Sequence, residues 1–205
     1  EKANFKELKE LDLSYNEINN INVLEKVDFK ELKKLYLNVN QISDINVLIK
    51  VNFEKLKLLN LGKNQINDIN VLEKVKFKKL QELYLYDNDI SNINILQNVD
   101  FKELKALDLN CISLLNPTNN NILENIKFEE LEKLNFSLNN ISDINIFKNI
   151  NFKKLKILIL AFNNISNLNP LENAEFENIE YLVLKYNQIS DINILESNKF
   201  KELKG

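Results

Sequence analysis

Hydrophobic residues recur along the chain with a fixed period. The phenylalanine that marks each unit returns every 24 residues, with one interval of 27, at Phe5, Phe29, Phe53, Phe77, Phe101, Phe128, Phe152, Phe176 and Phe200. A constant period in this range is typical of a solenoid, in which each repeat buries its hydrophobic face against its neighbours. We expect one domain over 1–205 with eight full repeats and a partial ninth, forming part of a longer protein.

Each unit contains a short stretch in which leucines alternate with variable residues, and this period of two predicts a strand. The eight expected strands are centred on Leu11, Leu35, Leu59, Leu83, Leu107, Leu134, Leu158 and Leu182. Successive repeats must place these strands side by side and parallel. The inward leucines then form the core, and the variable residues between them point to the opposite, concave face.

An asparagine follows almost every strand, at Asn16, Asn40, Asn64, Asn88, Asn139, Asn163 and Asn187, whereas the fifth repeat has Ile112 in this place. An inward asparagine needs partners for its amide, and the turn after the strand offers unpaired backbone groups. A polar binding site is the alternative, but we interpret the series as a buried structural asparagine ladder.

The return segment begins with a second asparagine, such as Asn22, which in six of eight repeats precedes Glu or Gln by three residues. This spacing predicts a capping box, for instance between Asn22 and Glu25, at the start of a short α or 3₁₀ segment on the convex side. The phenylalanines that follow are expected to stack from repeat to repeat.

One repeat is irregular. Residues 110–121 contain a three-residue insertion that includes Pro117, which predicts an exposed turn. The insertion is either a binding element or the product of sequence drift, and the sequence leaves both open.

The recurring pattern LxxLxLxxNxIxxIxxLxxVxF resembles the leucine-rich repeats. The stretch from Gln41 to Leu48 is similar to the short class found in the internalins and in the leucine-rich regulatory subunit of protein phosphatase 1. The resemblance implies an α/β solenoid: a right-handed horseshoe with a parallel sheet on the concave face and short α or 3₁₀ segments on the convex face. It also implies a scaffold that binds another protein through the concave face and the ascending loops.

Two other roles stay open beside that scaffold. The chain could be a targeting or regulatory domain of an enzyme whose catalytic part lies elsewhere, or an internalin-like surface adhesin. The compartment is not determined: the cytoplasm is slightly favoured and the cell surface is the alternative, because a single cysteine is compatible with either and the sequence starts at Glu1 rather than at a methionine.

Composition argues against catalysis. The chain has no histidine and only Cys111, so it lacks a Ser-His-Asp or Cys-His arrangement and a Cys/His zinc site. Its carboxylates are expected on solvated segments where nothing would shift their pKa values. We therefore expect no enzyme activity, no metal and no cofactor.

Charge and hydropathy restrict the partners. The net charge is −3 with Lys and Glu intermixed, so no basic stripe is available for nucleic acid. No apolar run approaches the roughly 18 residues of a membrane span. Another protein is the expected partner, and uncapped ends would also permit self-association.

The outward strand positions and the residues just after each strand vary most freely, and all six tyrosines lie there. Exposed tyrosines on a concave sheet are favoured interface anchors. The candidate partner-binding residues are Tyr15, Tyr36, Tyr84, Tyr86, Ile157, Ile159, Phe162, Tyr181, Val183 and Tyr186. Repeats seven and eight, which also contain Ala161, are expected to expose hydrophobic surface, whereas repeats one to four are mostly charged and polar.

Overall fold

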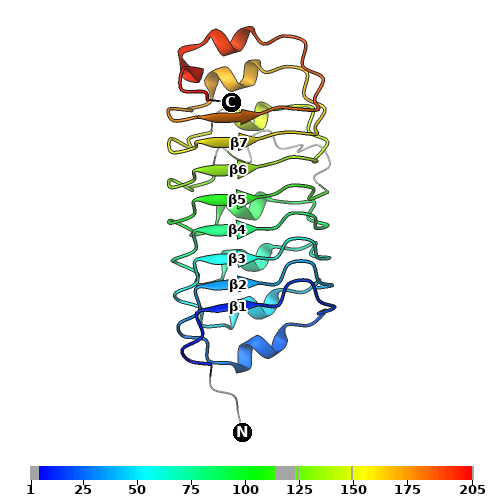
Figure 1. Ribbon diagram of the computed structural model, residues 1–205, viewed down its shortest axis with the longest axis vertical. Coiled ribbons are helices and arrows are strands. Elements are labelled where there is room, and N and C mark those ends of the chain that lie inside the picture. Colours follow the sequence, from blue (N-terminus) through cyan, green and yellow to red (C-terminus); the bar gives the residue numbers. More distant parts are fainter. Residues whose placement is uncertain (1–4, 114–122, 124, 149, 205) are drawn as a thin grey trace.

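The computed structural model of the protein describes residues 5–113, 123, 125–148 and 150–204. The predicted irregular turn at 110–121 therefore lies largely outside the described residues. The described part of the chain is an elongated stack of repeats, with the strands in front and the helical segments behind them (Figure 1).

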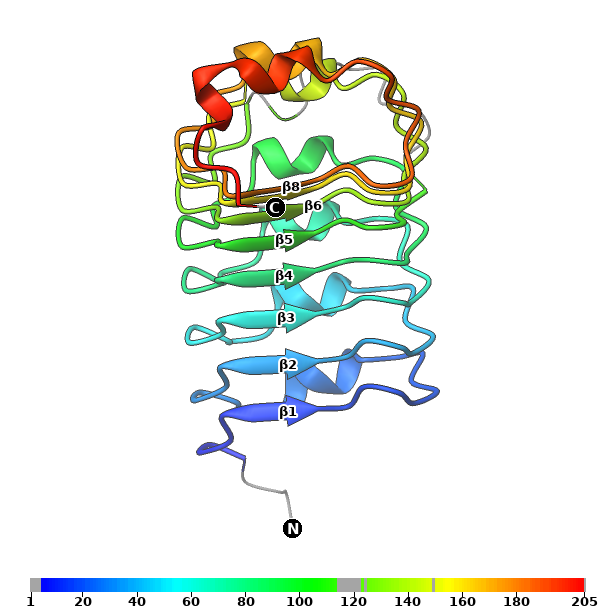
Figure 2. The same ribbon diagram turned by 45° about the horizontal axis from the view of Figure 1, so that its top comes forward.

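Eight strands form one parallel sheet in sequence order. They are β1 (Glu10–Asp12), β2 (Lys34–Tyr36), β3 (Leu58–Asn60), β4 (Glu82–Tyr84), β5 (Ala106–Asp108), β6 (Lys133–Asn135), β7 (Ile157–Ile159) and β8 (Tyr181–Val183). Each predicted central leucine is paired with that of the next repeat, as Leu11 is with Leu35. Figure 2 shows the strands as the rungs of a ladder, so the predicted solenoid and its parallel sheet are confirmed.

The return segments are 3₁₀ helices, which resolves the choice between α and 3₁₀. They are η1 (Asn22–Lys26), η2 (Asn46–Ile49), η3 (Asn70–Glu73), η4 (Asn94–Gln97), η5 (Asn145–Phe147), η6 (Asn169–Asn173), η7 (Asn193–Glu196) and η8 (Asn198–Phe200). They lie on the side of the core opposite the sheet (Figure 2).

The predicted capping box is wrong. Asn22 and its equivalents are the first residues of the helices, and the residue before each helix, such as Ile21, makes no side-chain capping hydrogen bond. Instead, the Asn or Asp two positions earlier accepts a hydrogen bond from that first N–H, as Asn20 Oδ1 does from Asn22 at 2.8 Å and Asp44 Oδ1 from Asn46 at 2.8 Å. The tight turn before each helix moves the capping role to this earlier residue.

The asparagine ladder is confirmed. The Asn64 side chain donates from Nδ2 to the carbonyls of Leu37 and Leu61, both at 3.0 Å, and its Oδ1 accepts from the Ile42 N–H at 2.9 Å. Asn40, Asn88, Asn163 and Asn187 bond in the same way. Each amide thus joins its own repeat to the preceding one.

The ladder is interrupted in the fifth repeat. Ile112 occupies the asparagine position and is fully buried, and its N–H donates to Asn139 Oδ1 at 2.9 Å. Its aliphatic side chain offers no amide to the preceding repeat. The interruption coincides with the change of strand register from 24 to 27 residues between Leu107 and Leu134.

The phenylalanine stack forms over the first four repeats. Ring centroids lie 5.6 Å apart for Phe5 and Phe29, 6.0 Å for Phe29 and Phe53, and 6.2 Å for Phe53 and Phe77. The later phenylalanines of this column are also buried in the core. The hydrophobic period therefore encodes a continuous core beneath the whole sheet.

Candidate interaction surface

The outward side of the sheet, together with the turn that follows each strand, is the surface on which the predicted site residues gather; we call it the sheet face. Tyr36, Tyr84, Ile157, Ile159, Tyr181 and Val183 lie on strands, and Tyr86 lies two residues past β4. Tyr15, Phe162 and Tyr186 lie in the turns, immediately before a ladder asparagine. The structure brings most of these residues into two clusters, and Tyr15 lies in the turn of the first repeat.

The turn residues have an unusual backbone conformation. The residue before each ladder position has a positive φ, between 52° and 58°, in all eight repeats: Tyr15, Val39, Lys63, Asp87, Cys111, Leu138, Phe162 and Tyr186. Residues other than glycine and asparagine adopt this left-handed conformation at a cost of about 1 kcal/mol or more. The conformation directs these side chains away from the core, and Tyr15 is 77% exposed.

The first cluster, which we call the tyrosine patch, consists of Tyr36, Asn60, Tyr84 and Tyr86 on repeats two to four. The strand register places Asn60 between Tyr36 and Tyr84. The Tyr84 hydroxyl donates to Glu82 Oε2, and burial, together with this carboxylate, raises the pKa of Tyr84. The ring of Tyr84 is half-buried, and the hydrogen bond to Glu82 holds it in one orientation.

Gly62 has no side chain, and this leaves room for the Tyr86 ring. The Tyr86 ring lies where a side chain on Gly62 would be, so that even a single Cβ at this position would overlap the ring carbons. Burial raises the pKa of Tyr86, whereas a hydrogen bond with the Asn60 side chain acts in the opposite direction. This packing of a tyrosine over a glycine was not predicted from the sequence, although Gly62 is one of only two glycines in the chain.

Gly62→Ala is expected to displace the Tyr86 ring from the sheet face while leaving the core intact. The added methyl group needs the volume that the ring occupies, and the flexible end of the side chain can swing out. Tyr86 fluorescence quenching by iodide should increase relative to the native protein in a background where the other tyrosines are phenylalanine. Unchanged quenching would show that the ring and the methyl group are accommodated together.

Asp108 is a carboxylate of the sheet face whose burial was not predicted from the sequence. It accepts hydrogen bonds from the Asn110 N–H at 3.0 Å and from Asn135 Nδ2 at 3.2 Å. Burial raises the pKa of Asp108 above its usual value, more strongly than these bonds and Lys133 lower it. The expectation that all carboxylates lie on solvated segments is therefore wrong for this residue, because the neighbouring repeats cover it.

The second cluster lies on repeats six to eight. Phe162 and Tyr186 stack with ring centroids 4.3 Å apart and planes 13° from parallel, and they are 43% and 70% exposed. Leu138, which the sequence analysis did not select, precedes them in the same turn position and is 49% exposed. We call Leu138, Phe162 and Tyr186 the apolar strip.

Strand residues border the apolar strip. Ile157 pairs with Tyr181 and Ile159 with Val183 across β7 and β8, and of these four Tyr181 is exposed while the others are half-buried. Ala161 is only 2% exposed, so the expectation that it adds exposed hydrophobic surface is wrong. A methyl group is too short to emerge between the longer side chains of adjacent repeats.

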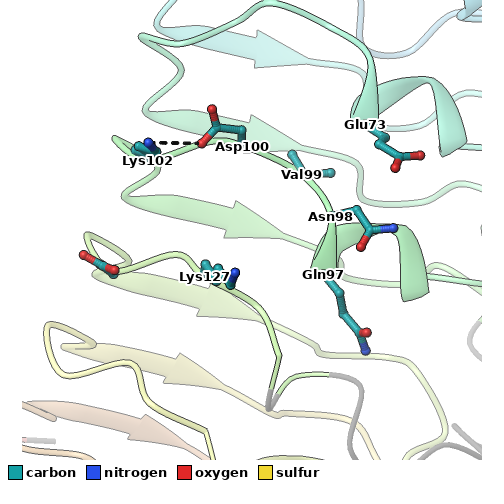
Figure 3. A pocket seen from close by; sticks show the side chains of 8 residues that line it. Glu73, Gln97, Asn98, Val99, Asp100, Lys102 and Lys127 are labelled. Carbon is teal, nitrogen blue, oxygen red and sulfur yellow. Dashed lines mark ion pairs between the residues drawn. The ribbon is translucent and has the colours of Figure 1, made fainter.

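Hollows elsewhere are polar. One of them, of about 710 Å³, opens on the helix side and is lined by Glu73, Gln97, Asn98, Val99, Asp100, Lys102, Lys127 and Glu129. Figure 3 shows Glu73, Gln97 and Asn98 beside the helical segments, and Asp100, Lys102 and Lys127 on the facing loops. Asp100 and Lys102 form an ion pair at 3.8 Å. This mixture of charges without an aromatic residue lacks the character of an interface core.

The described residues contain no group of three His, Cys, Asp or Glu side chains arranged to hold a metal ion. In the same part of the chain, no helix has the length and apolar character needed to cross a membrane.

Comparison with known proteins agrees with this geometry. A family model for leucine-rich repeats in two copies matches residues 6–50. No curated protein sequence matches the chain. Among solved structures, internalin C2 from Listeria monocytogenes is 25% identical with a TM-score of 0.74, over 96% of this chain and 78% of that one.

Two further structures have the same fold. Internalin F from Listeria monocytogenes is 25% identical with a TM-score of 0.64, over 96% of this chain and 59% of that one. A plant peptide hormone receptor, RGFR1 in complex with RGF2, is 19% identical with a TM-score of 0.65, over 97% of this chain and 31% of that one. The chain is therefore a leucine-rich-repeat protein that resembles the internalins.

Proposed function

We propose that the chain binds another protein through its sheet face, with the tyrosine patch and the apolar strip as the main contact areas. Leucine-rich repeats generally mediate protein–protein interactions, and solenoids of this kind present an extended binding surface. The observation that carries the proposal is the placement of exposed aromatic side chains. Five of the nine large hydrophobic residues that are exposed in the described chain lie on the sheet face, and four of these five are aromatic: Tyr15, Leu138, Phe162, Tyr181 and Tyr186.

The flank of the solenoid has a different character. Ion pairs between successive repeats cover it, including Lys79 with Glu103 at 2.8 Å and Lys154 with Glu130 at 2.6 Å. Of the exposed apolar residues on the helix side, Val23 and Ile49 lie on different helices and Ile192 directly precedes a third. Scattered apolar residues of this kind are normal on protein surfaces, whereas contiguous aromatic groups indicate an interface.

The test is to immobilise the protein, capture a partner from extracts and measure how substitutions change its retention. Tyr84→Ala and Ile159→Ser should each reduce retention about tenfold or more, because large residues near the centre of a contact carry most of the binding energy. Tyr84→Phe keeps the ring but removes the hydroxyl that donates to Glu82, so it separates the role of the ring from that of the hydrogen bond.

The control is the double substitution Lys76→Ala and Lys78→Ala on the helix-side flank, where both residues are exposed. Lys79 is left unchanged because its ion pair with Glu103 joins two repeats. Circular dichroism must show that every variant is folded. Retention that is lost in the lysine variant and kept in the tyrosine and isoleucine variants would place the binding site on the outer surface and refute the proposal.

A further inference from the structure

The apolar strip has features that stability does not explain. Leu138, Phe162 and Tyr186 have φ values of 57°, 56° and 57°, a conformation in which glycine or asparagine is favoured. Their side chains are nevertheless large and remain 43% to 70% exposed, so little core burial compensates for the backbone conformation. The same turn position in repeats three and four holds Lys63 and Asp87. A run of three apolar residues in this position is therefore specific to repeats six to eight.

The charge around the apolar strip has one sign. On repeats six to eight the sheet face contains two lysines, Lys133 and Lys185, and no carboxylate. Lys185 Nζ lies 5.8 Å from the centre of the Phe162 ring, and it forms no ion pair with the residues that the structure describes. The ammonium group is thus held beside the stacked rings by a cation–π contact and remains available to an anion.

Asp108 of repeat five partly balances the charge of Lys133, whereas the residues that flank the strip do not neutralise Lys185. Glu132 and Glu180 precede strands β6 and β8, but they already pair with Lys156 at 2.7 Å and Lys204 at 2.8 Å. On the other flank, Asn164 and Gln188 are neutral and bond to each other at 3.3 Å.

The sheet face of repeats one to five has the opposite character. It contains five carboxylates and two lysines: Glu10, Asp12, Glu82, Asp87, Asp108, Lys34 and Lys63. A partner that covers the whole face therefore meets a negative, tyrosine-containing surface at one end and a positive, apolar surface at the other. Complementary charge of this kind fixes the orientation in which a partner docks.

We propose that repeats six to eight bind a protein segment in which large apolar side chains alternate with carboxylates. The apolar side chains pack on the rings of Phe162 and Tyr186 and on Leu138, and a carboxylate pairs with Lys185. This proposal rests on the proposed function and specifies the chemistry of the partner at one end of the sheet face.

The test uses three fluorescein-labelled peptides of twelve residues and fluorescence anisotropy. The first repeats the unit Leu-Glu-Phe-Glu; the second replaces its glutamates with lysines; the third keeps the glutamates and replaces leucine and phenylalanine with serine. The native protein should bind the first at least about tenfold more tightly than either of the others, because only the first matches both the rings and the ammonium group. Its affinity should fall as salt is added.

Matched substitutions locate the binding. Lys185→Glu should weaken the glutamate peptide and strengthen the lysine peptide, whereas Lys63→Glu, the same charge reversal in repeat three, should change neither. Phe162→Ser should weaken the glutamate peptide about tenfold. Ile49→Ser, which alters a residue of similar exposure on the helix side (40% against 43%), should have no effect.

Equal or tighter binding of the lysine peptide, absence of binding to all three peptides, or insensitivity to Phe162→Ser and Lys185→Glu would overturn the proposal. A native dimer in sedimentation velocity that Phe162→Ser converts to a monomer would also overturn it, because a second copy of the chain would then cover the strip. These results concern only repeats six to eight. The capture experiment with Tyr84→Ala, in repeat four, decides separately whether the sheet face binds a protein.

Discussion

Phe53→Ala is expected to lower the free energy of unfolding by about 3 to 5 kcal/mol, the usual range for removing a buried aromatic side chain. Phe53 is 1% exposed and lies between the rings of Phe29 and Phe77, at centroid distances of 6.0 and 6.2 Å. The substitution removes both ring contacts and leaves a cavity that the flanking repeats, held by strand pairing on one side and helix contacts on the other, cannot close.

Phe5→Ala is the matched control for this prediction. Phe5 belongs to the same column and contacts one ring, that of Phe29 at 5.6 Å, but it is 42% exposed. Its removal should cost less than half as much as the removal of Phe53. Urea denaturation followed by far-ultraviolet circular dichroism would measure both free energies. Equal losses would show that position within the stack does not determine the contribution of a ring.

Much of the fold was predictable because each repeat contains the same pattern of hydrophobic and polar residues. Leu11 and Leu13 alternate with polar residues and point into the core at β1 and just after it, Asn16 follows in the turn, and Phe29 ends the unit. Eight copies of one pattern leave a single way to bury all of these residues, namely a stack of parallel strands with the leucines inward. The ladder role of the asparagine followed from the same reasoning, since a buried amide needs the backbone partners that a turn supplies.

Local turn geometry was less predictable. A capping box and an Asn or Asp two residues before the first helical N–H require almost the same residue types, so Asn20, Asn22 and Glu25 were compatible with both. The difference depends on the backbone of Ile21, whose φ of −114° and ψ of 14° place Asn22 inside the helix. Sequence spacing alone does not specify that angle.

The composition of the sheet face was predicted, but its packing was not. Tyr86 was selected as an outward residue, yet the space that it fills is created by Gly62 in the adjacent repeat. Leu138 was not predicted, although it occupies the same turn position as Phe162 and Tyr186. Asp108 was not predicted because its burial depends on neighbours 24 and 27 residues away. Comparison of equivalent positions between repeats is the signal that could have found these residues.

Asn64→Ala is expected to destabilise the protein by about 1 to 3 kcal/mol, the cost of leaving a buried polar group without its hydrogen bond. The partners of Asn64 are not affected equally by the loss of its hydrogen bonds. The carbonyls of Leu37 and Leu61 each keep one ladder bond, from Asn40 and Asn88. The Ile42 N–H instead loses Asn64 Oδ1, its acceptor at 2.9 Å, within a fully buried residue.

Ile112 explains why one natural gap in the ladder does not contradict this prediction. There the spacing between paired strand residues is 27 instead of 24, from Leu107 to Leu134, so the backbone differs from that of the regular repeats. Asn64→Ala removes the amide without any such adjustment of the backbone. Lys78→Ala, at an exposed position one repeat later, is the control and should leave stability unchanged. Thermal denaturation compares the two variants: a lower Tm for Asn64→Ala alone is the expected result, and equal Tm values would mean that the ladder does not contribute to stability.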